Sequence, residues 1–311
     1  MARVRPWSRH ALRALPISPQ ACIGVRSGRA STVASVAAAA AAATALAVEG
    51  RAGRSDRPIG CEDDPDAHKK WFKRWEANSI GWHLDTVNPY LERFLGELLP
   101  PTKTATAGLG PRVLVPLCGK TVDMAFLARR GYRVVGIEAV RQAVDEFATE
   151  HGVTGHSVAI NLPPPIDSQR FRAHAVLLGA GAEERVRAEP PPPVLVVEGD
   201  FLALRPADVQ ALVPFDAAFD RGGLVAVQPS CRQRYSQVLA DLIAPGGRVL
   251  LVIPEHDPFA DGSLGPPFEV SEAEVHALFA KHFNVRLVLR EDRLDKDQRM
   301  RQRGVTRFHE C

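Results

Sequence analysis

The chain has 311 residues, enough for one large α/β domain with extensions, and its 45% hydrophobic and 24% charged residues are ordinary for a folded protein. A formal net charge of only +3 gives no reason to expect a nucleic-acid partner. The 5 cysteines include no CxxC pair and the 10 histidines no HExxH motif, which argues against a metal centre.

The beginning of the chain differs in composition from the rest. No acidic residue precedes Glu49, whereas arginines are frequent there: Arg3, Arg5, Arg9, Arg13, Arg26 and Arg29. A basic, acid-free, Ser- and Ala-rich start is typical of an organelle transit peptide, so residues 1–57 are expected to be disordered and outside the fold. A mitochondrial address is favoured and a plastid stays open, while a tail without an address would leave the protein in the cytoplasm.

The apolar run from Val33 to Val48 lies within this segment. It is too short and too rich in alanine for a membrane span, so no stable membrane insertion is expected.

Two helices are predicted before the first strand. The stretch "HKKWFKRWEA", residues 68–77, places Trp71 and Trp75 on one side of a helix, a pattern that is equally typical of a helix covering a core. A second helix is expected over 88–99, with Pro89 in its first turn.

From Arg112 onward, strands and helices alternate, which predicts a mostly parallel sheet with helices on both faces. The pair Ser271 and Glu274 predicts a capping box at the start of the last long helix. The expected strands are 113–116, 132–137, 194–197, 215–219, 248–253 and 284–289, and the expected helices are 121–130, 140–151 and 232–243.

A proline-flanked segment interrupts this alternation at about 161–193. We expect an insertion or a mobile loop on the sheet there, with a short strand near 173–178. The charged end of the chain leaves little length for a final strand.

The turn after the first strand lies where an open α/β sheet binds its ligand. Glu138 ends the second strand, 19 residues after Gly119, and is placed to accept hydrogen bonds from a ribose. The turn "LCGK" has one glycine, where a dinucleotide site needs G-x-G-x-x-G. The residues therefore favour an adenosine ligand without phosphates, S-adenosylmethionine above all, and leave a nucleotide open.

Two further motifs follow strands. In "GDF", Asp200 can accept from an adenine amino group while Phe201 lies against the ring. In "FDRGG", Asp220 and Arg221 lie at the edge where a substrate meets the donor, although a surface ion pair worth less than about 1 kcal/mol is the alternative. Cys118 is expected to be a small turn residue because no base is near it, and an exposed turn position is expected for Lys120.

Several segments, in order, resemble the thiopurine S-methyltransferase family: "WFKRW", "IGWH", "PLCGKTVDMAFLARRGYRVVGIE", "GDF", "FDAAFDRGGLVAV", "PGGRVLLV" and "GPPFEV". The resemblance spans about Trp71 to Val270 and leaves out the N-terminal extension and the proline-flanked insertion. It implies a Rossmann-like class I methyltransferase over residues 58–311, with a seven-stranded, mostly parallel sheet.

The resemblance also implies site residues. Those implied for S-adenosylmethionine are Trp71, Leu117, Gly119, Glu138, Asp200, Phe201 and Arg221. Those implied around the acceptor are Trp82, where the family often has Phe, together with Pro266 and Pro267, which otherwise only shape a loop. A second arginine near the substrate is expected in the charged end, where Arg299 is the candidate and Arg301 and Arg303 compete.

The implied reaction is methyl transfer from S-adenosylmethionine to a sulfur nucleophile, a thiopurine or another aromatic or heterocyclic thiol. No strong base is needed because such thiols ionise readily, and Arg221 and Arg299 would favour the thiolate. A methyltransferase for halide, hydrogen sulfide, selenium or tellurium species and an inactive donor-binding module both stay open. The expected partner is therefore a small-molecule thiol or chalcogen, and the chain is expected to be a monomer.

Overall fold

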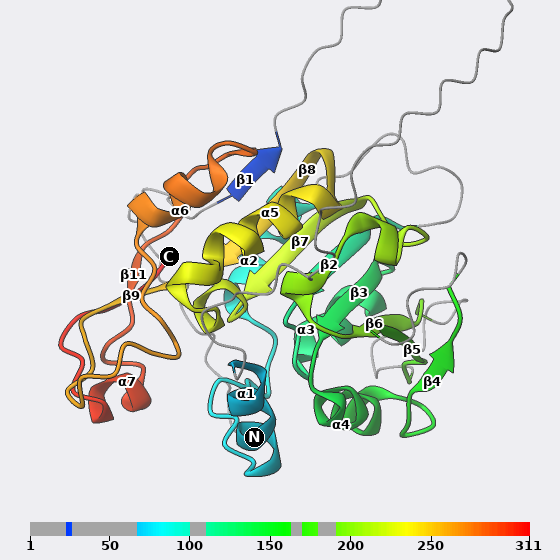
Figure 1. Cartoon of the computed structure of the whole chain (residues 1–311), viewed down its shortest axis with the longest axis horizontal. Coiled ribbons are helices and arrows are strands. Elements are labelled where there is room, and N and C mark those ends of the chain that lie inside the picture. Colours follow the sequence, from blue (N-terminus) through cyan, green and yellow to red (C-terminus); the bar gives the residue numbers. More distant parts are fainter. Residues whose placement is uncertain (1–22, 27–66, 100–109, 163–169, 180–190) are drawn as a thin grey trace, which may run out of the picture.

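The computed structural model describes residues 23–26, 67–99, 110–162, 170–179 and 191–311. At its centre is an open sheet of nine strands in the order β10-β1-β8-β7-β2-β3-β6-β5-β4 (Figure 1). Their bounds are β1 Ile23–Arg26, β2 Arg112–Pro116, β3 Arg133–Glu138, β4 Val158–Ile160, β5 Arg172–Val176, β6 Val194–Glu198, β7 Phe215–Arg221, β8 Ile243–Val252 and β10 Phe283–Asn284.

The middle of this sheet is parallel, from β8 through β7, β2 and β3 to β6. Antiparallel strands lie at both sides, where β5 pairs with β6 and β1 pairs with both β8 and β10. The predicted class, a Rossmann-like, mostly parallel sheet, is confirmed. Among the described residues, this sheet has nine strands instead of the expected seven.

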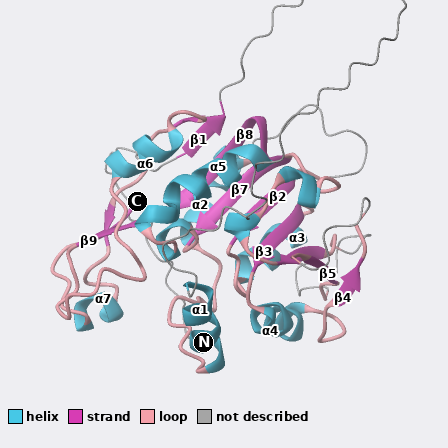
Figure 2. Cartoon of the chain, in the orientation of Figure 1, coloured by secondary structure: helices cyan, strands magenta, loops and turns pink. Residues whose placement is uncertain are grey.

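Helices cover both faces of the sheet (Figure 2). Their bounds are α1 Ala67–Glu76, α2 Pro89–Leu98, α3 Val122–Arg129, α4 Arg141–His151, α5 Arg232–Leu242, α6 Glu272–Phe279 and α7 Gln298–Gln302. Because side chains alternate along a strand, Val113 and Val115 of β2 pack with α2, α3 and α4, while Leu114 packs with α5 and α6. The two helix layers bury their apolar sides against opposite faces of the sheet. The ends of the strands are left for a site.

Helix caps connect these layers. The Asn88 side chain accepts from Tyr90 N at 2.9 Å and caps α2. The backbone N–H of Asn88 donates to Asp123 Oδ1 of α3 at 2.8 Å. At α6, Ser271 caps the N–H of Glu274 at 3.2 Å as expected, but the Glu274 carboxylate binds Arg232 of α5 at 2.7 Å. Only half of the predicted capping box forms, because an arginine is a stronger partner for a carboxylate than a backbone N–H.

Other strands differ from the sequence predictions. The strand expected over 284–289 is the two-residue β10, and β4 was not predicted. The strand expected near 173–178 is β5, so this part of the insertion belongs to the main sheet, whereas 163–169 and 180–190 lie outside the described residues. A small second sheet contains β9 Pro254–His256, β11 Glu291–Asp292 and β12 Phe308–Glu310.

One strand comes from the segment that was expected to lie outside the fold. Ile23–Arg26 forms β1 and pairs Val25 with both Arg248 and Asn284. The rest of residues 1–57 lies outside the described residues, and the organelle address stays a prediction. Among the described helices, none is long and apolar enough to cross a membrane.

A glycine in β3 lets the turn beyond β2 pack closely against the sheet. A Cβ at Gly136 would lie 2.6 Å from Cys118 Sγ and 2.8 Å from Met124 Sδ. Gly136→Ala is therefore expected to lower the free energy of unfolding by about 1–3 kcal/mol through overpacking, measured by urea denaturation.

Gly96→Ala is the matched control. Gly96 is exposed in α2 and a Cβ there would meet nothing within 4 Å, so alanine should raise the free energy of unfolding by about 0.5–1 kcal/mol. Equal effects of the two substitutions would contradict the close approach at Gly136.

Candidate active site

A cavity of about 810 Å³ lies at the carboxyl ends of β2, β3, β6 and β7, and α1 forms part of its wall. Its volume is within the range of small-molecule sites. The residues that the family resemblance implied for the donor and the acceptor line this one cavity, together with Arg299, the candidate second arginine: Trp71, Trp82, Leu117, Gly119, Glu138, Asp200, Phe201, Arg221, Pro266, Pro267 and Arg299.

Glu138 is held at the end of β3 by two backbone groups. Its Oε2 accepts from Gly119 N and its Oε1 from Val140 N, both at 2.8 Å. The residue is 8% exposed, so these bonds fix a nearly buried carboxylate on the cavity wall. Each oxygen has a further lone pair, so the side chain can still accept hydrogen bonds from ribose hydroxyls.

The turn after β2 has an unusual backbone. Leu117 has a φ of 45° and Gly119 a φ of 52°, both in the left-handed region. For leucine this conformation is uncommon, and such residues cluster at functional sites. A Cβ at Gly119 would lie 3.4 Å from the Trp75 ring, so this glycine lets α1 pack closely over the turn.

The other two residues of this turn have structural roles. Burial and the nearby Glu138 carboxylate raise the pKa of the Cys118 thiol well above its ordinary value, which keeps it protonated and fits the expectation that it is no nucleophile. Lys120 is not the exposed turn residue that was expected. Its Nζ binds Glu146 at 2.9 Å and Glu150 at 2.6 Å and so ties the turn to α4.

Asp200 and Phe201 follow β6. Asp200 Oδ1 accepts from Leu202 N at 2.8 Å and caps a short 3₁₀ turn, Phe201–Ala203. Phe201 is 3% exposed and packs against Tyr235 with ring centroids 4.9 Å apart. Both residues reach the cavity wall, and their roles around an adenine stay predictions.

Three tryptophans form a cluster where α1 meets the cavity. The Trp82 ring packs edge-on against Trp71 at 5.1 Å and Trp75 at 6.1 Å between centroids. Trp75 is buried against Val140 and Ala143, whereas Trp71 and Trp82 are half-buried on the cavity wall. Helix α1 therefore covers both the core and the cavity.

The two ionisable residues of the "DRG" motif at the end of β7, Asp220 and Arg221, have different partners. Asp220 is fully buried and accepts from Tyr235 OH at 2.7 Å and Gly223 N at 2.9 Å. The proposed ion pair with Arg221 is therefore wrong. Arg221 instead donates through Nη1 to the Trp82 carbonyl, and burial lowers its pKa. This bond connects the end of β7 to the loop that carries Trp82.

Two arginines of the charged end reach the cavity wall, Arg299 and Arg303, and the described wall does not include Arg301. Arg303 donates to Pro266 O at 3.0 Å and to Ser263 Oγ at 3.1 Å, so it fixes the proline loop. Arg299 is half-exposed and its charged partner is Asp297 at 3.3 Å. A substrate role for Arg299 stays a prediction.

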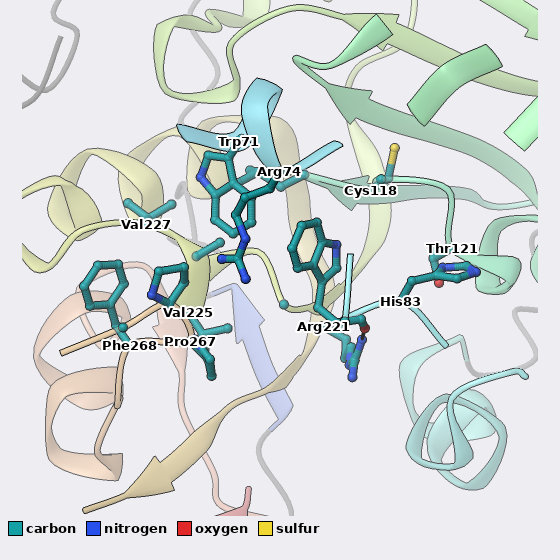
Figure 3. A pocket seen from close by; sticks show the side chains of 18 of the residues that line it. Trp71, Arg74, His83, Cys118, Thr121, Arg221, Val225, Val227, Pro267 and Phe268 are labelled. Atoms are coloured by element: carbon teal, nitrogen blue, oxygen red, sulfur yellow. Dashed lines mark hydrogen bonds between the residues drawn. The ribbon is translucent and has the colours of Figure 1, made fainter. Parts of the chain in front are cut away.

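Arg74 and His83 are among the cavity residues that the sequence analysis missed. Arg74 follows Trp71 by three positions, and that spacing alone places both on one side of α1. Trp71 and Arg74 extend from α1 into the cavity, while His83 and Thr121 are at another side of it (Figure 3). Burial, followed by the charge of Lys120, lowers the pKa of His83.

The buried Asp220 predicts a pH-dependent stability. Burial raises its pKa from 3.8 to about 6, against the opposing hydrogen bonds from Tyr235, Gly223 and Leu224. Because the folded pKa is above the unfolded one, this carboxyl stabilises the fold fully below about pH 4 and loses that contribution as the pH rises through about 6.

Asp220→Asn removes this titration. Between pH 4 and pH 7, the free energy of unfolding of the wild type should fall relative to the variant by up to about 3 kcal/mol. Denaturation at a series of pH values measures the difference, with Asp241→Asn at an exposed position of α5 as control. A wild-type–variant difference that stays constant with pH would contradict the prediction.

Comparison with known proteins identifies relatives over most of the chain. The family model for thiopurine S-methyltransferase matches residues 66–311. The thiopurine S-methyltransferase of Pseudomonas fluorescens is 35% identical over 244 residues, 77% of this chain and 94% of that protein. The one from Azotobacter vinelandii is 37% identical over 243 residues, again 77% and 94%.

Among solved structures, a TehB-like S-adenosylmethionine-dependent methyltransferase from Corynebacterium glutamicum aligns with 72% of this chain and 98% of its own. The sequence identity is 13% and the TM-score 0.36, a similarity too low to support an argument.

Proposed function

Because the chain belongs to the thiopurine S-methyltransferase family, whose members transfer a methyl group from S-adenosylmethionine, we propose that its acceptor is the sulfur of an aromatic or heterocyclic thiol. One observation carries the proposal. A single cavity has a carboxylate suited to a ribose, Glu138, and also an aromatic and arginine-lined region around Trp82 and Arg221.

The donor half of the cavity fits S-adenosylmethionine. Glu138 would hold the ribose, Asp200 and Phe201 the adenine, and Trp71 with the Leu117 turn the methionine portion. The donor supplies a methyl group already activated on a sulfonium. The protein's task is then to position the two substrates and to exclude water, effects that can account for much of such a rate.

The acceptor half of the cavity suits a flat, ionisable ligand. Trp82, Pro266 and Pro267 provide apolar surface on its wall. In the described part of the chain no carboxylate forms an ion pair with Arg221, so its charge can favour a thiolate. A halide or hydrogen sulfide would leave most of this surface unused, which favours the larger acceptor.

A panel of acceptors with methyl-labelled donor tests the proposal. Heterocyclic and aryl thiols should be methylated with a higher kcat/KM than iodide, hydrogen sulfide or selenium and tellurium species. Activity on iodide or sulfide without activity on aryl thiols would replace the proposal with its first alternative. Donor binding without any transfer would indicate an inactive binding module.

Glu138→Gln is the inactive control for this panel. It should weaken S-adenosylmethionine binding by about tenfold or more, measured by calorimetry, because a charged acceptor is lost. Glu198→Gln is the matched variant, since Glu198 pairs with Glu138 across β6 and β3 but is not part of the described cavity wall. Equal binding by both variants would remove Glu138 from the donor site.

Arg221→Met tests the electrostatic role of this arginine. If Arg221 favours the thiolate, kcat for an aryl thiol at saturating substrates should fall by about 100-fold at pH 6.5 and by only about tenfold at pH 9, because kcat reports the ionisation of the bound thiol, which at pH 9 ionises without help. Arg221→Lys, which keeps a charge, should lie between the two. A loss that is the same at both pH values would show that Arg221 only positions the substrate.

A further inference from the structure

Arg74 is a half-buried cation on the cavity wall without a counter-charge. Its guanidinium lies over the ring of Trp82 at 4.7 Å and near that of Trp71 at 5.4 Å. In the part of the chain that the structure describes, no carboxylate forms an ion pair with it. Burial lowers its pKa, and the charge of Arg303 lowers it further.

The carboxylates on the same wall are already engaged elsewhere. Asp297 binds Arg299, and Glu310 binds Arg293 at 3.2 Å. Glu138 accepts from two backbone N–H groups, and Asp200 caps the turn after β6. A partly desolvated guanidinium stacked on aromatic rings is unfavourable unless an anion joins it, so a ligand in the cavity is the natural source of a counter-charge for Arg74.

The position of Arg74 indicates which half of the cavity receives this anion. Figure 3 shows Arg74 reaching from α1 toward the middle of the cavity, with Val225 and Pro267 on one side and Arg221 on another. Arg303, whose charge lowers the pKa of Arg74, donates to Pro266 O in the same proline loop. These residues border the acceptor half.

We propose that the acceptor is an anionic aromatic thiol, with a carboxylate on the ring in addition to the thiol, and that Arg74 binds this carboxylate opposite Arg303. The inference rests on the proposed thiol methylation and specifies its substrate class. Stacking on Trp82 uses the face of the guanidinium and leaves its N–H edge for a planar, bidentate carboxylate. Arg74 is then a specificity residue, and the aryl thiol ring lies between it and Arg221.

Matched acceptors test the proposal. The wild type should methylate 3- or 4-mercaptobenzoate with a kcat/KM at least about tenfold above that for benzenethiol, since a hydrogen-bonded charge pair contributes about that much. Arg74→Met should remove this preference, mainly through the KM of the mercaptobenzoate. Arg74→Lys should keep part of it, and Lys69→Met, an exposed position of the same helix, should keep all of it.

Three results would overturn the inference. One is an unchanged preference in Arg74→Met. Another is that Arg74→Met weakens donor binding and raises the KM of mercaptobenzoate and of benzenethiol, all by the same factor. That result would assign Arg74 to the carboxylate of the donor. The third needs no variant and holds even if Arg74→Met fails to fold: equal wild-type activity on the mercaptobenzoate and on the corresponding mercaptobenzamide. Benzenethiol methylation without a carboxylate preference would refute the inference alone, whereas no methylation of any thiol would refute the proposed function.

Discussion

The bonds from Gly119 N and Val140 N to the Glu138 carboxylate are the constraint on which the site depends. They join the turn after β2, the end of β3 and the start of α4 at one point. Trp75 packs against Gly119 and Val140, so the position of α1 follows from the same point. The buried Glu138 carboxylate therefore fixes the position of the turn in the donor half and, through that turn, the position of α1, which covers it.

The acceptor half depends on a second connection, between the end of β7 and the loop of Trp82. Asp220 is held by Tyr235 and by the N–H of Gly223, which fixes the backbone that carries Arg221. Arg221 then holds the Trp82 carbonyl, and a Cβ at Gly81 would lie 3.7 Å from Arg299 Nη1. Two arginines from distant parts of the chain thus lie against the loop that carries Trp82, so the position of this loop and the charge around the acceptor are linked.

The sequence predicted most of the central strands because buried parallel strands are continuous apolar runs, and it predicted Glu138 because motif and strand end coincide. It could not predict features that depend on distant partners. The alternative of an ion pair between Asp220 and Arg221 fails because Tyr235 donates to the Asp220 carboxylate. The capping box at α6 forms only in part because Arg232 binds the Glu274 carboxylate. Arg74 was missed because its significance comes from Arg303, more than two hundred residues away, although its spacing from Trp71 was visible.

Strand β1 occupies the space between β8 and β10, yet its four residues belong to the segment predicted to direct the chain to an organelle. Removal of that segment would leave two unpaired backbone edges in the sheet, and such edges are templates for aggregation. If the predicted transit peptide directs sorting and is removed, sorting and folding make opposite demands on Ile23–Arg26. A chain that keeps these residues pairs them with β8, whereas a chain without them has an unpaired edge there.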